Sequence, residues 1–369
     1  MFLGLAELRH APGRFVVLGV VLGLLVALMT ALATIADRHV TDLTGKVATS
    51  PADLLVLDAA AQGALQASRI DDEAAAHVRQ HAAGAELAPV GEQRMGARVA
   101  DGELLDLSLW GLDPDSPAAP EVIAGRLPRQ PGEAVLDVAD RAQGAALGER
   151  LTLVDTGTVL EIVGFTAEAR FGAIPTAAVT YDAWTEIAAE AADADPDEVE
   201  PTAMAVRADG GVEELAAALN GSSSPVQAAP PSSLASQLPG VAGVRASFGL
   251  LLGVAWMAVA AVAATFAVAG VAHRQRTIAL LRAVGAPRRR LLAALTVQLL
   301  VVTAVGAVLA ALLVVLAAWL APADVPLRWE PGTWAASAAV ALAATLMASA
   351  VAVVRLARVA PVDALGARR

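Results

Sequence analysis

Residues 246–272 read ASFGLLLGVAWMAVAAVAATFAVAGVA, and residues 273–290 follow with HRQRTIALLRAVGAPRRR. The first stretch contains no charged residue and exceeds the ~20 residues that an α-helix needs to cross a bilayer. The second contains six arginines and no acidic residue, which is typical of a loop on the cytoplasmic side of a membrane. Together they predict a transmembrane helix that leads into a basic cytoplasmic segment.

Three more stretches are free of charge and long enough to span a bilayer, at residues 15–36, 291–323 and 331–354. Hydrophobic residues make up 56% of the 369-residue chain and charged residues 17%, against about 25% charged residues in soluble domains. The sequence therefore predicts an α-helical membrane protein with four transmembrane helices. A cleaved signal peptide is the alternative for the first stretch, but its apolar core is longer than the roughly 7–15 residues of such peptides.

The distribution of charge predicts the orientation. Residues 37–245 hold 13 Lys+Arg and 33 Asp+Glu for a net charge of −20, whereas the rest of the chain holds 13 and 4 for a net of +9. The basic segments 1–14, 273–290 and 355–369 are expected in the cytoplasm. Residues 37–245 and the short turn at 324–330 are then expected outside, and residues 1–14 form an amphipathic N-terminal segment.

The outer region 37–245 has the pattern of a mixed α/β domain inserted between the first and second spans. Stretches of alternating apolar residues or of β-branched residues predict strands, and amphipathic stretches that begin with acidic residues predict helices. The strands are expected at residues 53–57, 133–137, 151–154, 159–163 and 177–181, and the helices at 71–83, 182–192 and 212–219. Residues 221–240 are rich in Ser, Pro and Gly and are expected to be a flexible connection, with a short strand near Val226.

Several classes of function lack their residues in this chain. The four spans contain no Asp, Glu, Lys, Arg or His, which disfavours an ion-coupled transporter or a channel. Lys46 is the only lysine and lies outside any phosphate-binding loop pattern, so we expect no ATP site in the chain itself. We also expect no catalytic residue, because no catalytic motif is present in the outer region. We expect no metal site, because His77 and His81 have helical spacing but no visible third ligand.

Glycine pairs with helical spacing occur in the first two spans, at Gly19 and Gly23 and again at Gly249 and Gly253. Such pairs let two helix backbones approach closely. Two interpretations stay open: packing within the chain, or a seam between the two copies of a homodimer.

The segment between the second and third spans contains apolar residues at a regular spacing. Thr277 to Val284 carries apolar residues at the spacing of an amphipathic helix, Gly285 can end that helix, and Pro287 can begin the next. A basic helix anchored to membrane lipid would explain the arginines. A lipid anchor does not explain why the helix is expected to break at Gly285 and Pro287, directly before a long span. This break favours a helix that contacts a partner protein.

The same residues resemble a known family. RTIALLRAVGAPRRRLL at 276–292 is similar to the cytoplasmic loop of FtsX-like, MacB-type permeases of ABC transporters, although Thr277 stands where that family usually has an acidic residue. RLARVAPVDAL at 355–365 is similar to the family's ending. Outer-region segments similar to its extracytoplasmic domain are GRL at 125–127, EAVLD at 133–137, LGERLTL at 147–153 and IVGF at 162–165.

Shorter segments resemble one branch of that family, the DevC-like glycolipid exporters and the HrtB-like haem exporters. They are MFLGLAELRHAPGRF at 1–15, LQASRI at 65–70 and LPGV at 238–241.

The resemblance implies a function. It implies a multi-pass permease subunit of an ATP-driven exporter in the bacterial cell (inner) membrane, working as a homodimer with a separate cytosolic ATPase that alone binds ATP and Mg²⁺. The export mechanism would be mechanical, for an amphipathic substrate such as haem or a lipid-like molecule. The residues that it implies for ATPase coupling are Arg276, Thr277, Ile278, Leu280, Leu281, Arg282, Val284 and Gly285.

Two other functions remain open at this point. An FtsX-type relay would control an extracellular partner without transport, and a membrane enzyme is disfavoured by the missing catalytic groups.

Overall fold

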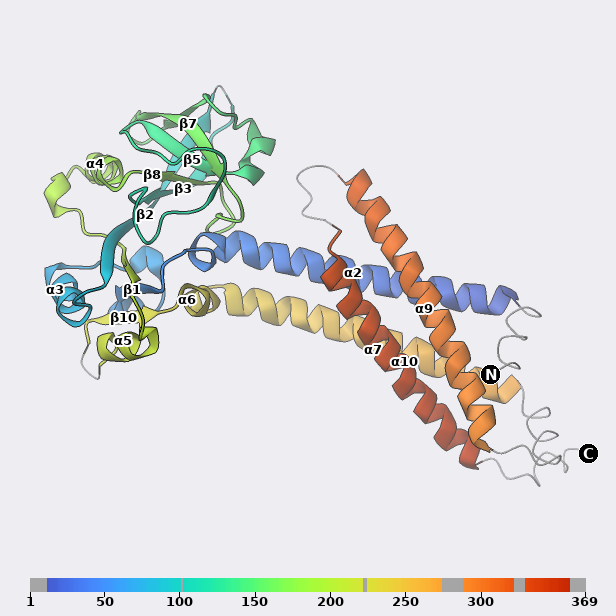
Figure 1. Cartoon of the computed structure of the whole chain (residues 1–369). Helices are drawn as coiled ribbons and strands as arrows, with labels where there is room; N and C mark the ends of the chain where they lie inside the picture. The colour runs from blue at the N-terminus through green and yellow to red at the C-terminus, as the bar shows by residue number, and fades with distance from the viewer. Residues whose placement is uncertain (1–11, 101, 222–223, 274–287, 322–328, 359–369) are drawn as a thin grey trace, which may run out of the picture. The chain divides into compact units, whose positions relative to one another are not determined.

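The computed structural model describes residues 12–100, 102–221, 224–273, 288–321 and 329–358 (Figure 1). The chain divides into two compact units, residues 38–245 and residues 1–37 together with 246–369. Each unit is described by itself below.

Four long helices contain the apolar stretches, and each is long and apolar enough to cross a membrane. They are α2 (Pro12–Ala48), α7 (Val241–His273), α9 (Arg288–Leu320) and α10 (Pro331–Arg358). The predicted fold class, four apolar helices with a mixed α/β domain between the first and second, is confirmed.

Helix α2 does not end with its charge-free stretch at Ala36. It continues to Ala48, because no proline or glycine interrupts residues 37–44 and Arg38 and Asp42 form an i,i+4 ion pair at 3.9 Å. Pro51, just beyond its end, disfavours a continuation.

All four helices of the first unit contribute to one apolar cluster. Its buried members include Leu22 on α2, Val259 on α7, Val302 on α9 and Ala341 on α10. Two polar contacts join α9 to α10: the hydroxyl groups of Thr303 and Thr345 lie 3.0 Å apart, and the indole N–H of Trp334 donates to the Ala307 carbonyl at 3.0 Å. These three side chains therefore contribute to packing between α9 and α10.

The outer unit is built on a ten-stranded sheet with the order β10-β1-β9-β2-β3-β8-β5-β7-β4, in which β6 pairs with β2 and β7. The strands are β1 (Leu54–Asp58), β2 (Glu86–Val99), β3 (Leu105–Gly111), β4 (Val122–Gly125), β5 (Glu133–Asp137), β6 (Arg150–Leu153), β7 (Val159–Thr166), β8 (Thr176–Val179), β9 (Ala203–Arg207) and β10 (Val226–Ala229).

Strand β2 joins the two halves of this sheet. Its residues 86–90 pair with β9, and its residues 91–97 pair with β3. Helices α3 (Asp72–His81) and α5 (Val212–Leu219) cover an apolar cluster on the β1–β9–β10 half. Helix α4 (Tyr181–Ala192) packs against β2 and β3 through Trp184 and Ile187 on the other half.

The expectation of a flexible connection at 221–240 is wrong for the described part of that segment. The short strand near Val226 is present as β10, paired antiparallel with β1. Helix α6 (Pro231–Gln237) follows it, starting at a proline and burying Leu234 and Ala235. Burial of Pro231, Leu234 and Ala235, together with the proline at its start, holds this Ser-rich turn of helix in place.

Candidate functional site

The predicted ATPase-coupling residues lie outside the described part of the chain. Helix α7 ends at His273 and α9 begins at Arg288, so Arg276, Thr277, Ile278, Leu280, Leu281, Arg282, Val284 and Gly285 fall in the interval between the described helices. Their coupling role stays a prediction from the sequence.

The two glycine pairs differ in their surroundings. A Cβ atom on Gly23 would lie 2.9 Å from the Gly306 carbonyl oxygen and 3.1 Å from Leu309, and one on Gly19 would lie 3.7 Å from Val302. The first pair therefore lets α2 pack closely against α9 inside one chain. At Gly249 and Gly253 an added Cβ would meet no heavy atom within 4 Å, so a homodimer seam there stays a prediction.

The end of α2 is held by the loop that connects β7 to β8, residues 167–175, which we call the docking loop. The N–H groups of Gly172 and Ala173 donate to the carbonyls of Leu43 and Asp42 at 3.0 and 2.9 Å. The N–H of Lys46 donates in return to the Arg170 carbonyl at 2.9 Å. The docking loop therefore bonds to backbone groups of α2 between Asp42 and Lys46, shortly before the helix ends at Ala48.

Glycine is required at one point of this contact. A Cβ atom on Gly45 would lie 2.1 Å from the Glu168 carbonyl oxygen and 3.3 Å from that of Arg170. These are backbone atoms, so no side-chain rotation could relieve the overlap. The contact between α2 and the docking loop is therefore closer than any other residue type allows.

Charged groups stabilise the docking loop from both sides. Arg170 forms an ion pair with Asp140, which is buried, and Arg38 on α2 lies 3.8 Å from Glu168. The N–H of Ala169 donates to the Asp137 carboxylate at 2.7 Å. Burial raises the pKa of Asp140 to about 6, against the opposing effect of Arg170.

Two membrane helices share one apolar cluster of the outer unit. Val47, near the end of α2, and Val241, at the start of α7, are both fully buried there, together with Trp110 and Phe171. Phe171 belongs to the docking loop and meets Trp110 edge to face, with ring centroids 5.3 Å apart. A displacement of α2 or α7 at this point must therefore disturb the same core.

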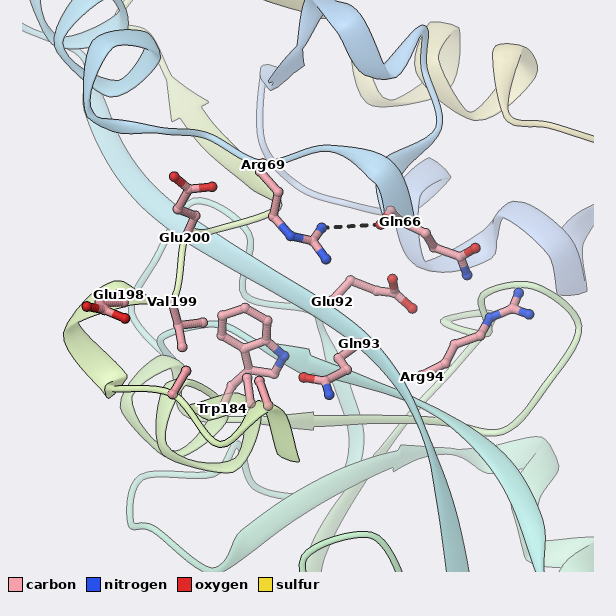
Figure 2. Close-up of a pocket in the computed structure, with 12 residues that line it drawn as sticks. Gln66, Arg69, Glu92, Gln93, Arg94, Trp184, Glu198, Val199 and Glu200 are labelled. Atoms are coloured by element: carbon pink, nitrogen blue, oxygen red, sulfur yellow. Dashed lines mark hydrogen bonds between the residues drawn. The ribbon is translucent and has the colours of Figure 1, made fainter. Parts of the chain in front are cut away.

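A pocket of about 540 Å³ opens on the outer unit, between η2 (Leu65–Ala67), β2, α4 and the segment before β9. Figure 2 shows Trp184 on one side of it and Gln66 and Arg69 on another, with Glu92 projecting from β2. Glu92 is 4% exposed and accepts a hydrogen bond from the Ser108 hydroxyl at 2.8 Å. Burial raises the pKa of Glu92.

Sequence reasoning did not find this pocket or the docking loop. Gln66, Glu92 and Trp184 come from three distant segments, and no local motif connects them. His77 and His81 do lie on one helix, with ring centroids 4.2 Å apart. Within the described ranges, no group of three His, Cys, Asp or Glu side chains has the arrangement of a metal site.

Comparison with known proteins gives a family for the C-terminal part of the chain. Residues 249–361 match the model of the family described as FtsX-like permease C-terminal. The predicted resemblance to FtsX-like permeases is confirmed over these residues, and the haem-exporter branch stays a prediction. No curated protein matches the sequence.

Two solved structures are similar to part of the chain. One is the extracellular domain of the ABC-type transporter YknZ from Gram-positive bacteria, at 12% identity and a TM-score of 0.33, covering 48% of this chain and 98% of that one. The other is the periplasmic region of MacB from Actinobacillus actinomycetemcomitans, at 10% identity and a TM-score of 0.36, covering 50% of this chain and 92% of that one.

Proposed function

From the match of residues 249–361 to the FtsX-like permease family, we propose that this chain is the permease subunit of an ATP-driven exporter. It works with a separate cytosolic ATPase, and it moves its substrate by transmitting motion along its helices. The observation that carries the mechanical part is the attachment of both α2 and α7 to one buried cluster of the outer unit.

The path of the motion follows from that attachment. Helix α2 is continuous from Pro12 to Ala48, and its last turn is bonded to the docking loop through Leu43 and Lys46. Helix α7 begins at Val241, inside the same cluster. A push on the cytoplasmic ends of these helices would reach the docking loop through backbone hydrogen bonds and packed side chains, both of which resist deformation.

The spans support this mechanism over a polar channel. Several buried hydroxyl groups in the described parts of these helices bond within the helical unit: Thr30 donates to the Val26 carbonyl, and the hydroxyl groups of Thr303 and Thr345 lie 3.0 Å apart. An amphipathic substrate, such as haem or a lipid-like molecule, would be taken up from the outer side or the outer leaflet. ATP and Mg²⁺ would be bound by the partner ATPase, and the permease would act as a homodimer in contact with membrane lipid.

Reconstitution tests the proposal. The chain is reconstituted in lipid vesicles alone and together with the cytosolic ATPase that co-purifies with it, and ATP hydrolysis is measured in both. We expect no hydrolysis by the chain alone and hydrolysis with the partner, accompanied by movement of the small molecule that co-purifies with the complex. Hydrolysis by the chain alone, or failure of the two proteins to associate, would contradict the proposal.

One variant addresses the coupling segment. Leu281→Asp places a charge on the apolar side of the predicted Thr277–Val284 helix, and an unpaired charge at a helix-in-groove contact costs several kcal/mol. The ATPase should no longer co-purify, while the permease still inserts. If the segment is only a lipid anchor, association survives Leu281→Asp, and removal of the charges at Arg274 and Arg276 has the larger effect on membrane binding.

The FtsX-type relay is distinguished by the same reconstitution. It would show partner-dependent hydrolysis without movement of any small molecule.

A further inference from the structure

We propose that the pocket between β2 and α4 is a binding site for an amphipathic anion, whose acidic group bonds to Arg69 and Arg94 and whose apolar part lies against Trp184. This binding activity is separate from the proposed permease function, because a ligand could bind to the pocket without the ATPase.

The size and the walls of the pocket fit a small organic molecule. Its volume of about 540 Å³ lies within the roughly 300–1,000 Å³ of ligand sites. Helix α4 contributes Trp184, Ala188 and Ala192, and Ala194 and Val199 add further apolar groups. Trp184 is held in place from below, since a Cβ atom on Gly91 or Gly111 would lie 2.2 or 2.3 Å from its side chain. The apolar wall is thus rigid.

The buried part of the pocket has a hydrogen-bond donor without a partner. Trp184 is 3% exposed, and its indole Nε1 bonds to no atom of the described residues. Buried donors are nearly always satisfied, and an indole N–H can only donate. The group that completes the site must therefore be an acceptor.

Two guanidinium groups, those of Arg69 and Arg94, add further groups that can only donate hydrogen bonds. Neither Arg69 nor Arg94 forms an ion pair with a carboxylate in the described part of the chain. Arg69 donates to the backbone carbonyls of Gln66 and Ser68, at 3.2 and 2.6 Å. Arg94 is oriented by the Gln66 side chain, whose amide oxygen accepts from Nε at 2.6 Å and from Nη2 at 3.0 Å. Guanidinium groups bind carboxylates and phosphates through paired donors.

The acidic residues of the pocket do not cancel this preference. Glu92 is buried and already accepts from Ser108, whose hydroxyl in turn accepts from the Trp110 indole at 2.9 Å. Burial raises the pKa of Glu92 and so opposes its negative charge, while Ser108, Arg94, Gln66 and Arg69 act in the opposite direction. Glu198 and Glu200 are exposed at the rim, where water screens them. Arg69 and Arg94 are exposed as well, so the preference for an acceptor rests on the buried indole N–H of Trp184 together with these two guanidinium groups.

The experiment uses the full chain in detergent with ¹⁵N-labelled tryptophan, so that each indole gives one resonance and the Trp184→Phe variant assigns that of Trp184. The probe is 1-naphthyl phosphate, which carries an acidic group on an apolar ring system. We expect a saturable shift of the Trp184 resonance. Arg94→Gln should weaken binding by about tenfold or more, because it removes charge-assisted hydrogen bonds.

Arg98→Gln is the matched control. Arg98 is exposed on the same strand, outside the pocket, so this variant should bind the probe as the wild type does. The neutral probe 1-naphthol should bind about tenfold more weakly than the phosphate. The proposal is overturned if no probe shifts the Trp184 resonance, if Arg94→Gln and Arg98→Gln have equal effects, or if the cationic probe 1-naphthylmethylamine binds more tightly than the phosphate.

Because this assay needs neither ATP nor the ATPase, a negative result would leave the proposed permease function standing.

Discussion

The backbone N–H of Lys46, in the last turn of α2, donates a hydrogen bond to the carbonyl of Arg170, 2.9 Å away in the docking loop. The side chain of Arg170 is paired with the buried Asp140. One residue of the loop therefore joins the end of a membrane helix to the interior of the outer sheet domain. This relationship makes the docking loop the point at which helix motion would enter the outer domain.

Gly45→Ala should loosen the docking loop. The new Cβ would overlap the Glu168 carbonyl oxygen, which would lie 2.1 Å away, and overpacking of this kind costs about 1–3 kcal/mol. Hydrogen exchange of peptides from residues 167–175 should accelerate about tenfold or more.

The matched control for Gly45→Ala is Gly243→Ala in α7, where an added Cβ meets no heavy atom within 4 Å. Exchange of the docking loop should be unchanged in that variant. Equal exchange rates in wild type and Gly45→Ala would show that the loop does not depend on close contact with α2.

Gly23→Val and Gly253→Val should separate packing within the chain from association between chains. The first variant forces α2 away from Gly306 on α9, where a Cβ would lie 2.9 Å from the carbonyl oxygen. Its thermal unfolding midpoint in detergent should fall by several degrees, as expected for a loss of about 1–3 kcal/mol.

A Cβ atom at Gly253 would have no heavy atom of the chain within 4 Å. Gly253→Val should therefore leave the thermal unfolding midpoint unchanged. If Gly249 and Gly253 form the homodimer seam, this second variant should shift the protein towards monomer in analytical ultracentrifugation. An unchanged oligomeric state in Gly253→Val would remove these glycines from the dimer interface.

Asp140 should make the outer domain less stable as pH rises. Its folded pKa of about 6 lies above the ordinary value of 3.8, so the folded state binds the proton more tightly than the unfolded state. The stabilisation from this group is full below about pH 4 and is lost as pH rises through 6.

The wild type should therefore lose about 2 kcal/mol relative to Asp140→Asn between pH 4 and 6.5, since each unit of pKa shift corresponds to about 1.4 kcal/mol and this pH range covers most of the shift. The measurement is the difference between the unfolding free energies of the two proteins across this range. A difference that is constant or grows in the opposite direction would contradict the assignment.

Cysteine labelling should establish the orientation of the chain. The sequence contains no cysteine, so a single introduced thiol is unambiguous. Ser232→Cys, at an exposed position of α6, should react with a membrane-impermeant maleimide in intact cells. Thr277→Cys, in the basic segment, should react only after the cells are opened, and the reverse pattern would invert the topology.

Much of the outer domain was predictable from local patterns. Strand β5 matches its predicted range of 133–137, and the strands expected at 151–154 and 159–163 are present as the antiparallel pair β6 and β7. Helix α5 occupies its predicted residues 212–219. Strand β5 was recognisable as a continuous apolar run, since it is buried on both faces. Helix α5 was recognisable from the helical period of its apolar residues.

Strand β2 was not predicted, although it is the longest strand in the described part of the chain at 14 residues. Pro89, Gly91 and Gly96 weaken its local strand signal. Pairing overrides that signal: β9, β3 and β6 bond to successive parts of β2, and Gly91 is needed because Trp184 packs directly on it.

The sequence by itself determined the four membrane helices, the acidic domain between the first two, and the absence of a phosphate-binding loop, because charge and hydrophobicity are properties of contiguous residues. Only the tertiary structure decided that Gly45 fits against Glu168 and that Arg94 and Trp184 line one pocket. These residues are far apart along the chain, and sheet pairing and packing alone bring them into contact.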